Sequence, residues 1–86
     1  MPCISRSYGI SIYVYYSDHA PPHVHARYAG QKTTVDIRTR AVVEGDISPR
    51  ALRLVREWLA LHELDVLASW EEARLGVPPG HVPPLP

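Results

Sequence analysis

The sequence predicts a single α+β domain: an antiparallel meander of three to four strands, followed by one kinked helix or two short helices packed on one sheet face (ββββαα). Two observations predict this class. Apolar residues alternate with period two in the first half of the 86-residue chain, and they recur with helical period after Pro49. We expect the domain to span residues 1–76 and a flexible proline-rich segment to span residues 77–86.

The composition excludes several classes of protein. With 45% hydrophobic and 21% charged residues, the chain is globular rather than disordered. A formal charge of zero argues against a strongly basic nucleic-acid coat or a polybasic membrane tether. The single cysteine excludes a disulfide framework and a cysteine-rich zinc site. Because no apolar run has membrane-spanning length and no export signal is evident, we expect a cytoplasmic protein without a membrane partner.

Alternation and turn residues define the predicted strands. We expect strands at residues 9–16, 23–28, 33–38 and 41–44. Pro21 and Pro22 place a loop between the first two strands, because proline cannot donate to a sheet ladder. The pair Ala29–Gly30 forms a tight turn, since glycine tolerates a positive φ. The side chains expected to face the helices are Ile10, Ile12, Val14, Tyr16, Val24, Ala26, Tyr28, Val35 and Ile37.

A helix is predicted to begin at Pro49, with Ser48 as its N-cap. Its apolar residues cover about half of the helix surface, as in a helix that lies across a sheet. The helical phase slips between His62 and Leu64, which predicts a kink or break there. The remaining helix ends near Leu75, before Gly76 and a run in which half of residues 77–86 are proline.

The opposite sheet face is expected to be uncovered and to carry the chemistry. His23 and His25 alternate along one strand, so their side chains point the same way, roughly 6.5–7 Å apart. Asp18 and His19 lie in the loop that enters this strand. The candidate binding residues on this face and loop are Tyr13, Tyr15, Asp18, His19, His23, His25, Arg27, Asp36 and Arg38.

One hypothesis is a metal site. His19, His23 and His25 offer three imidazoles, enough to hold zinc or another transition metal with one coordination position open. Asp18 could be a further ligand or could orient one of the histidines. The competing interpretation is that these histidines and Asp18 are solvated polar residues on an exposed strand and its loop. Only the metal-site hypothesis requires a cofactor.

A second hypothesis is RNA binding or phosphodiester chemistry on the same face. Tyr13 and Tyr15 could stack on bases, and Arg27 could pair with phosphate. If the protein is an enzyme, His23 or His25 is the general base and the other polarises the phosphate. The zero net charge weakens affinity for a nucleic-acid backbone. The sequence leaves open whether the protein is an enzyme.

Several segments resemble a family of small bacterial proteins, domain of unknown function family 4160. They are Met-Pro-Cys-Ile-Ser-Arg, Gly-Ile-Ser-Ile-Tyr-Val-Tyr-Tyr, Asp-His-Ala-Pro-Pro-His-Val-His-Ala-Arg-Tyr and Arg-Ala-Leu-Arg-Leu-Val-Arg-Glu-Trp. The resemblance runs from Met1 to about Gly76. Ser7 replaces the aromatic residue usual in the family, Val24 stands where Phe is common, and the proline-rich end differs.

The resemblance implies an interaction protein. Members of this family are often encoded beside another small protein, an arrangement like a toxin–antitoxin module. This implies one component of a two-protein regulatory pair, with a small protein partner and RNA as ligands of the exposed His/Tyr/Arg face. A third hypothesis is a structural adaptor that forms homo-oligomers through an uncovered sheet edge or its helices.

Overall fold

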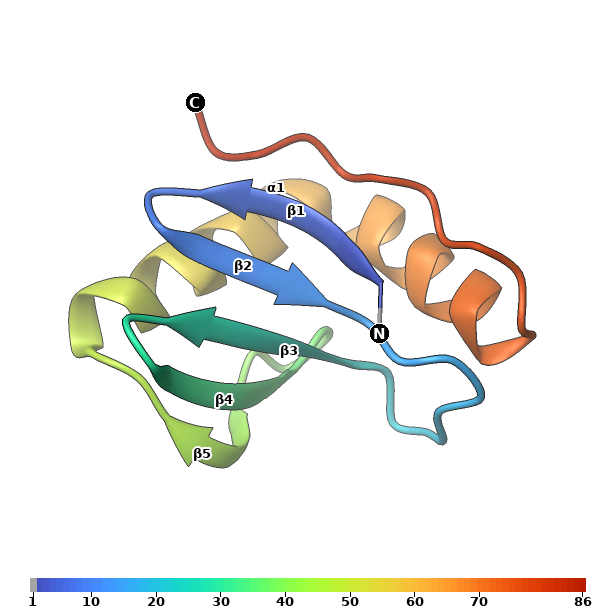
Figure 1. Ribbon diagram of the computed structural model, residues 1–86, viewed down its shortest axis with the longest axis horizontal. Coiled ribbons are helices and arrows are strands. Elements are labelled where there is room, and N and C mark those ends of the chain that lie inside the picture. Colours follow the sequence, from blue (N-terminus) through green and yellow to red (C-terminus); the bar gives the residue numbers. More distant parts are fainter. Residues whose placement is uncertain (1) are drawn as a thin grey trace.

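The computed structural model describes residues 2–86, and it confirms the α+β class (Figure 1). Five strands form one sheet in the order β1-β2-β3-β4-β5, with every neighbouring pair antiparallel. The prediction of three to four strands was therefore too low by at least one. The elements in chain order are β1 (Cys3–Ser7), β2 (Ile10–Tyr13), β3 (His23–Tyr28), β4 (Gln31–Asp36), β5 (Val42–Asp46) and α1 (Pro49–Arg74).

The extra strand is β1, which joins β2 through a tight turn at Tyr8–Gly9. Both turn residues have positive φ, 53° and 77°. The turn between β3 and β4 is built in the same way, with φ of 48° at Ala29 and 80° at Gly30. Positive φ at both central residues suits the right-handed twist of a two-residue hairpin. Only the second turn was predicted, because Gly9 was assigned to the start of a strand.

Side chains alternate between the two sheet faces as predicted. Val24, Ala26 and Val35 are fully buried on the face that α1 covers. Their strand neighbours point to the other face, where His25 pairs in register with Tyr13 on one side and Thr34 on the other. The inward placement of Tyr16 was wrong: β2 ends at Tyr13, and the Tyr16 side chain is 46% exposed.

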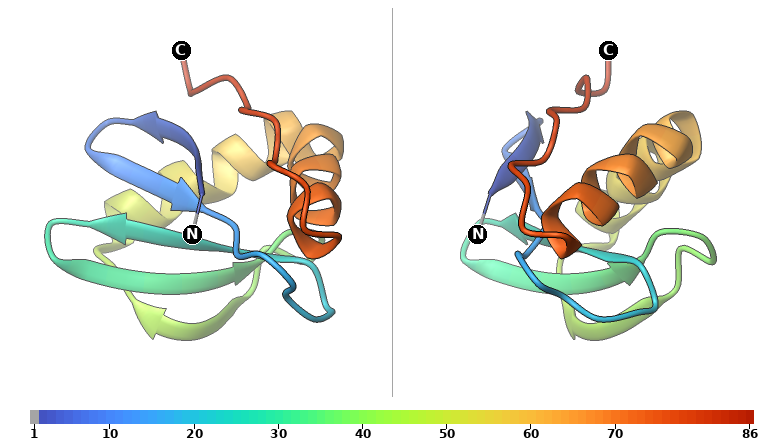
Figure 2. Two further views of the ribbon diagram at one scale, coloured as in Figure 1. Left: turned by 45° about the vertical axis from the view of Figure 1, so that its right-hand side comes forward. Right: turned by 90° about the vertical axis from the view of Figure 1, so that its right-hand side faces the viewer.

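One helix, α1, packs across the apolar sheet face (Figure 2). Ser48 caps it, because its hydroxyl oxygen accepts a hydrogen bond from the Ala51 amide at 3.2 Å. His62 has non-helical angles, φ −123° and ψ 24°, so the predicted kink is confirmed. Two helical halves therefore meet at His62, in agreement with the prediction of one kinked helix or two short ones, and the second half ends before Gly76, where φ is 80°. No helix within residues 2–86 has the length and apolarity needed to cross a membrane.

The proline-rich segment 77–86 lies between β1 and α1 (Figures 1 and 2). The Val82 side chain is buried in the core, and the Val82 amide donates to the Ile4 carbonyl at 2.8 Å. Leu85 packs partly buried against the same core. The expected flexibility of the segment stays a prediction, whereas its packing against the domain is a feature that the proline content did not indicate.

Gly45 in β5 is expected to be intolerant of a side chain. Its φ is +76°, and an added Cβ would lie 2.4 Å from the Lys32 carbonyl oxygen. We expect Gly45→Ala to lower the free energy of unfolding by more than about 2 kcal/mol, measured by urea denaturation. Gly30→Ala is the matched control, because φ there is +80° and nothing lies within 4 Å. It should cost about 1 kcal/mol, and equal losses for both variants would contradict the expectation.

Candidate functional site

The candidate site lies where the loop between β2 and β3 crosses the start of β3. His23 and His25 come from β3, and Asp18 comes from the loop. The loop is held in place because the Ser17 amide donates to the Ala73 carbonyl at 3.0 Å, which ties it to the end of α1. The site therefore depends on contacts between three parts of the chain.

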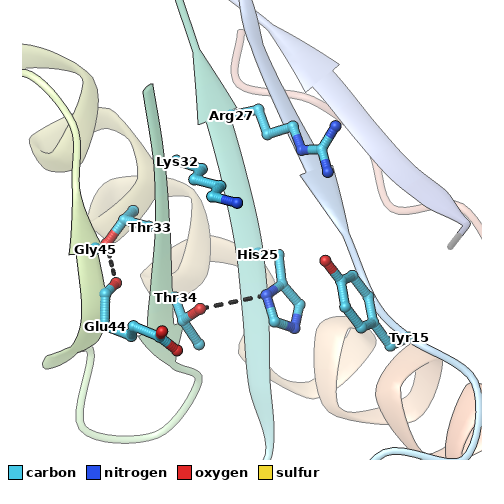
Figure 3. Close-up of a pocket in the computed structure, with 8 residues that line it drawn as sticks. All are labelled: Tyr15, His25, Arg27, Lys32, Thr33, Thr34, Glu44 and Gly45. Carbon is cyan, nitrogen blue, oxygen red and sulfur yellow. Dashed lines mark hydrogen bonds between the residues drawn. The ribbon is translucent and has the colours of Figure 1, made fainter. Parts of the chain in front are cut away.

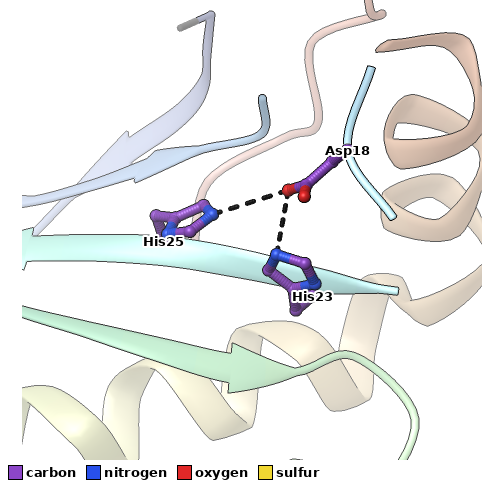
Figure 4. A group of neighbouring side chains, drawn as sticks. All are labelled: Asp18, His23 and His25. Carbon is purple, nitrogen blue, oxygen red and sulfur yellow. Dashed lines mark ion pairs between the residues drawn. The ribbon is translucent and has the colours of Figure 1, made fainter. Parts of the chain in front are cut away.

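Three side chains converge there (Figure 4). Oδ2 of Asp18 lies 2.9 Å from Nε2 of His23 and 3.7 Å from Nε2 of His25. The three side chains are 11%, 13% and 20% exposed, respectively. We call Asp18, His23 and His25 the Asp–His–His cluster. It brings one carboxylate oxygen and two imidazole nitrogens together in a largely shielded place.

Each histidine of the cluster is oriented through its other ring nitrogen. Nδ1 of His23 lies 2.7 Å from the Pro21 carbonyl oxygen, and Nδ1 of His25 lies 3.2 Å from the Thr34 hydroxyl. The Tyr15 ring stacks on the His25 ring, with centroids 3.9 Å apart and planes 15° apart. Both Nε2 atoms are thereby directed toward Asp18, and the rings have little freedom to turn away.

The hydrogen-bond pattern leaves the centre of the cluster unsatisfied. A carbonyl oxygen only accepts, so Nδ1 of His23 donates to Pro21, and Nε2 of a neutral His23 ring then carries a lone pair. That lone pair faces the Asp18 carboxylate, so the 2.9 Å contact is a hydrogen bond only when His23 is doubly protonated. Oδ2 of Asp18 and Nε2 of His25 are both buried without a hydrogen-bond partner. Such groups are costly unless a proton or a cation lies among them.

The protonation of His25 is set mainly by its surroundings. Burial lowers the pKa of His25 from the ordinary value of 6.5, and the nearby His23 lowers it further. The Asp18 carboxylate raises this pKa but does not outweigh those effects. At neutral pH, His25 is accordingly a neutral imidazole, the form in which histidine binds metal ions.

Three other residues predicted for the site, His19, Asp36 and Arg38, lie outside the cluster. The His19 ring is 92% exposed, with Nδ1 3.5 Å from Oδ1 of Asp18, the carboxylate oxygen that the other two histidines do not approach. Asp36 is used within a turn, because its Oδ1 accepts from the amides of Arg38 and Thr39 at 2.8 Å each. The Arg38 side chain is exposed.

A shallow hollow of about 280 Å³ lies on the uncovered sheet face beside His25 (Figure 3). The Arg27 guanidinium on its rim lies 5.2 Å from the centre of the Tyr13 ring. Lys32, Thr34 and Glu44 were not predicted as site residues, although the alternation that placed Asp36 on this face also places Thr34 and Lys32 there. The hollow is lined by Tyr15, His25, Arg27, Lys32, Thr33, Thr34, Glu44 and Gly45.

Fold and site together define a small α+β domain: a five-stranded meander covered on one face by a helix, with an Asp–His–His cluster at the start of its central strand. The family model for a domain of unknown function, DUF4160, matches residues 9–71, and the chain belongs to this family. The match includes all three cluster residues. No curated protein and no solved structure matches the chain.

We expect the Tyr15 ring to be part of what lowers the pKa of His25. Tyr15→Ala removes the stacked ring, so the pKa of His25 should rise toward 6.5. An NMR titration of the imidazole signals in chelator-treated protein measures this, with Tyr16→Ala, at an exposed tyrosine, as the control. An unchanged pKa in Tyr15→Ala would contradict it. Since the pKa of His25 is lowered in the folded state, the free energy of unfolding should begin to decrease as the pH drops below 6.5 and should continue to decrease until the pH passes the lower pKa of the folded state.

Proposed function

We propose that the protein binds a divalent transition-metal ion, with zinc as the best candidate, through Asp18, His23 and His25. The observation that carries the proposal is the convergence of Oδ2 of Asp18 and the two Nε2 atoms within 4.8 Å of one another. Two imidazoles and one carboxylate form a recurrent ligand set of catalytic zinc and of non-haem iron. Asp18 takes the place that the sequence had assigned to His19.

The distances support this assignment. Zinc–ligand bonds of roughly 2.0–2.2 Å in a tetrahedral site place neighbouring donor atoms roughly 3.3 Å apart. The observed separations of 2.9 Å and 3.7 Å lie on either side of that value. A cation between these atoms would also satisfy Oδ2 of Asp18 and Nε2 of His25, neither of which has a hydrogen-bond partner.

The surrounding contacts support it as well. Metal-binding histidines almost always hydrogen-bond through their second ring nitrogen to a carbonyl, carboxylate or water. Here the Pro21 carbonyl holds His23 and the Thr34 hydroxyl holds His25. The ligands are thus oriented by the strand and the loop without the ion.

Three protein ligands leave a coordination position free, as in catalytic rather than structural zinc sites. When bound, such an ion polarises carbonyl or phosphoryl groups and lowers the pKa of water. In this proposal His23 and His25 are ligands. The general-base role considered from the sequence is less favoured, because Nε2 of His25 is buried and faces Asp18.

The interaction hypotheses stay predictions. A small protein partner, RNA, a toxin–antitoxin-like pairing, self-association and a cytoplasmic location are all compatible with membership of DUF4160. Tyr13 and Arg27 remain the residues of the uncovered sheet face best placed to contact such a partner.

Metal binding is tested by titrating untagged, chelator-treated protein with Zn²⁺ in a calorimeter. We expect one ion per chain and a rise in Tm on binding. Asp18→Asn and His25→Ala each remove one ligand. They should weaken binding by more than the roughly 10–100-fold typical of losing a residue that only orients a ligand.

His19→Ala is the matched control, because it removes an adjacent histidine whose ring is in solvent. It should leave the affinity within a few-fold of the wild-type value. Absence of Zn²⁺ binding by the wild-type protein, or an equal loss in His19→Ala and His25→Ala, would refute the proposal.

A further inference from the structure

Two cations lie opposite each other on the uncovered sheet face. Arg27 of β3 and Lys32 of β4 are direct partners in the strand register, and both side chains are exposed. Like charges directly opposite each other in an antiparallel pair are unfavourable, because their Cβ atoms are only about 4.5–5.5 Å apart. An anion bound between the two side chains would offset this cost.

The two cations lie at one end of the hollow beside His25, and an acid lies at the other end (Figure 3). Lys32 and Thr34 alternate along β4, so their side chains project from the same face, roughly 6.5–7 Å apart. Glu44 of β5 lies opposite Thr34. The hollow is therefore positive at the end of Arg27 and Lys32 and negative at the end of Thr34.

The other charges of this row lie outside the hollow. Arg6 of β1 lies opposite Ser11, which in turn lies opposite Arg27. Asp46 of β5 lies opposite Lys32, on the side away from Arg27. The acids of β5 thus confine the positive potential to the middle of the sheet, and the formal charge of the chain is zero. This favours a compact anion over a nucleic-acid backbone, whose binding depends on many phosphate contacts.

A second hollow, of about 510 Å³, begins at the same two cations. Arg27 and Lys32 line both hollows, and the other residues that line the second one are uncharged. An anion between the two side chains therefore has room on both sides. The second hollow is lined by Gly9, Ser11, Arg27, Tyr28, Ala29, Gly30, Gln31 and Lys32.

We propose that the hollow beside His25 binds a small phosphate monoester that carries hydroxyl groups, a sugar phosphate in chemical class. Its phosphoryl group lies between Arg27 and Lys32. At neutral pH this group carries a charge of roughly −1.5 to −2, which matches two cations better than the single charge of a carboxylate does. The hydroxyl groups donate to the Glu44 carboxylate, which only accepts when it is ionised.

The size and place of the hollow agree with this ligand. Its volume of about 280 Å³ is close to the lower end of the roughly 300–1,000 Å³ of pockets that hold small molecules. A ligand bound there lies next to His25, and hence beside the metal site proposed above. The proposal does not rest on metal binding, because Arg27, Lys32 and Glu44 lie outside the Asp–His–His cluster.

The probe is ribose 5-phosphate, titrated into untagged, chelator-treated protein in a phosphate-free buffer and followed by NMR of the backbone amides. We expect saturable shifts in β3 and β4 around the two cations. Arg27→Gln and Lys32→Gln should each weaken binding at least about tenfold, because each removes a charged donor to the phosphoryl group. Both positions are exposed, and circular dichroism checks that each variant is folded.

Arg6→Gln is the matched control, because it removes the same charge from an exposed position of the same row, outside the hollow. Arg6 is two strands from Arg27, roughly 9–10 Å. That distance is about one Debye length in 0.1 M salt, so the affinity should change by less than about twofold.

Ribose and inorganic phosphate separate the two ends of the ligand. Ribose lacks the charged group, so it should not bind measurably. Inorganic phosphate lacks the hydroxyl groups, so it should bind the wild-type protein more weakly than ribose 5-phosphate does. Glu44→Ala should abolish this preference, because it removes the acceptor for the hydroxyl groups and leaves both cations in place.

Absence of saturable ribose 5-phosphate binding to the wild-type protein would overturn the proposal, whatever the outcome of the zinc titration. Equal losses in Arg6→Gln and Arg27→Gln would also overturn it, because they would indicate diffuse attraction to the whole row. Tighter binding of a short RNA than of ribose 5-phosphate would make the face a nucleic-acid surface instead. Inorganic phosphate that binds as tightly as ribose 5-phosphate would refute the role of the hydroxyl groups and of Glu44.

Discussion

The alternation of β3 is the constraint on which the rest of the structure depends. Val24 and Ala26 are fully buried under α1, so His23 and His25 must point to the other sheet face. A shift of one residue in register would exchange these two sets, placing both imidazoles in the core. The burial of two small apolar side chains thus fixes the direction of the two histidines. The site is a consequence of core packing.

The Asp–His–His cluster is arranged at a cost to the fold. Burying Oδ2 of Asp18 and Nε2 of His25 without a hydrogen-bond partner is unfavourable. The loop is nevertheless tied to α1 through Ser17 and Ala73, which holds Asp18 over β3. Replacing a buried ion pair with packed apolar residues is often neutral or stabilising, so the cluster is not needed for stability, and the metal site proposed above would account for it.

Much of this could be predicted from sequence periodicity, and the exceptions have physical reasons. Alternation along β3 and β4 predicted which side chains are buried, and the phase slip in α1 predicted the kink at His62. The choice between Asp18 and His19 as the third member of the cluster could not be predicted, because it depends on how a proline-containing loop folds back over the sheet. Strand β1 was missed because Gly9, the second residue of the turn between β1 and β2, was assigned to the start of a strand, which left no turn signal between residues 3–7 and 10–13.

The proline-rich segment shows a different limit of prediction from the sequence. Proline content indicates that residues 77–86 cannot be a helix or a central strand, but it does not distinguish a free chain from a docked one. The distinguishing signal is the three-residue spacing of Pro79, Val82 and Leu85, the residues of this segment that are not exposed. The family match covers residues 9–71, so it contains the metal-ligand candidates and Trp58 but neither β1 nor this segment. The cluster therefore belongs to the part of the chain that defines the family.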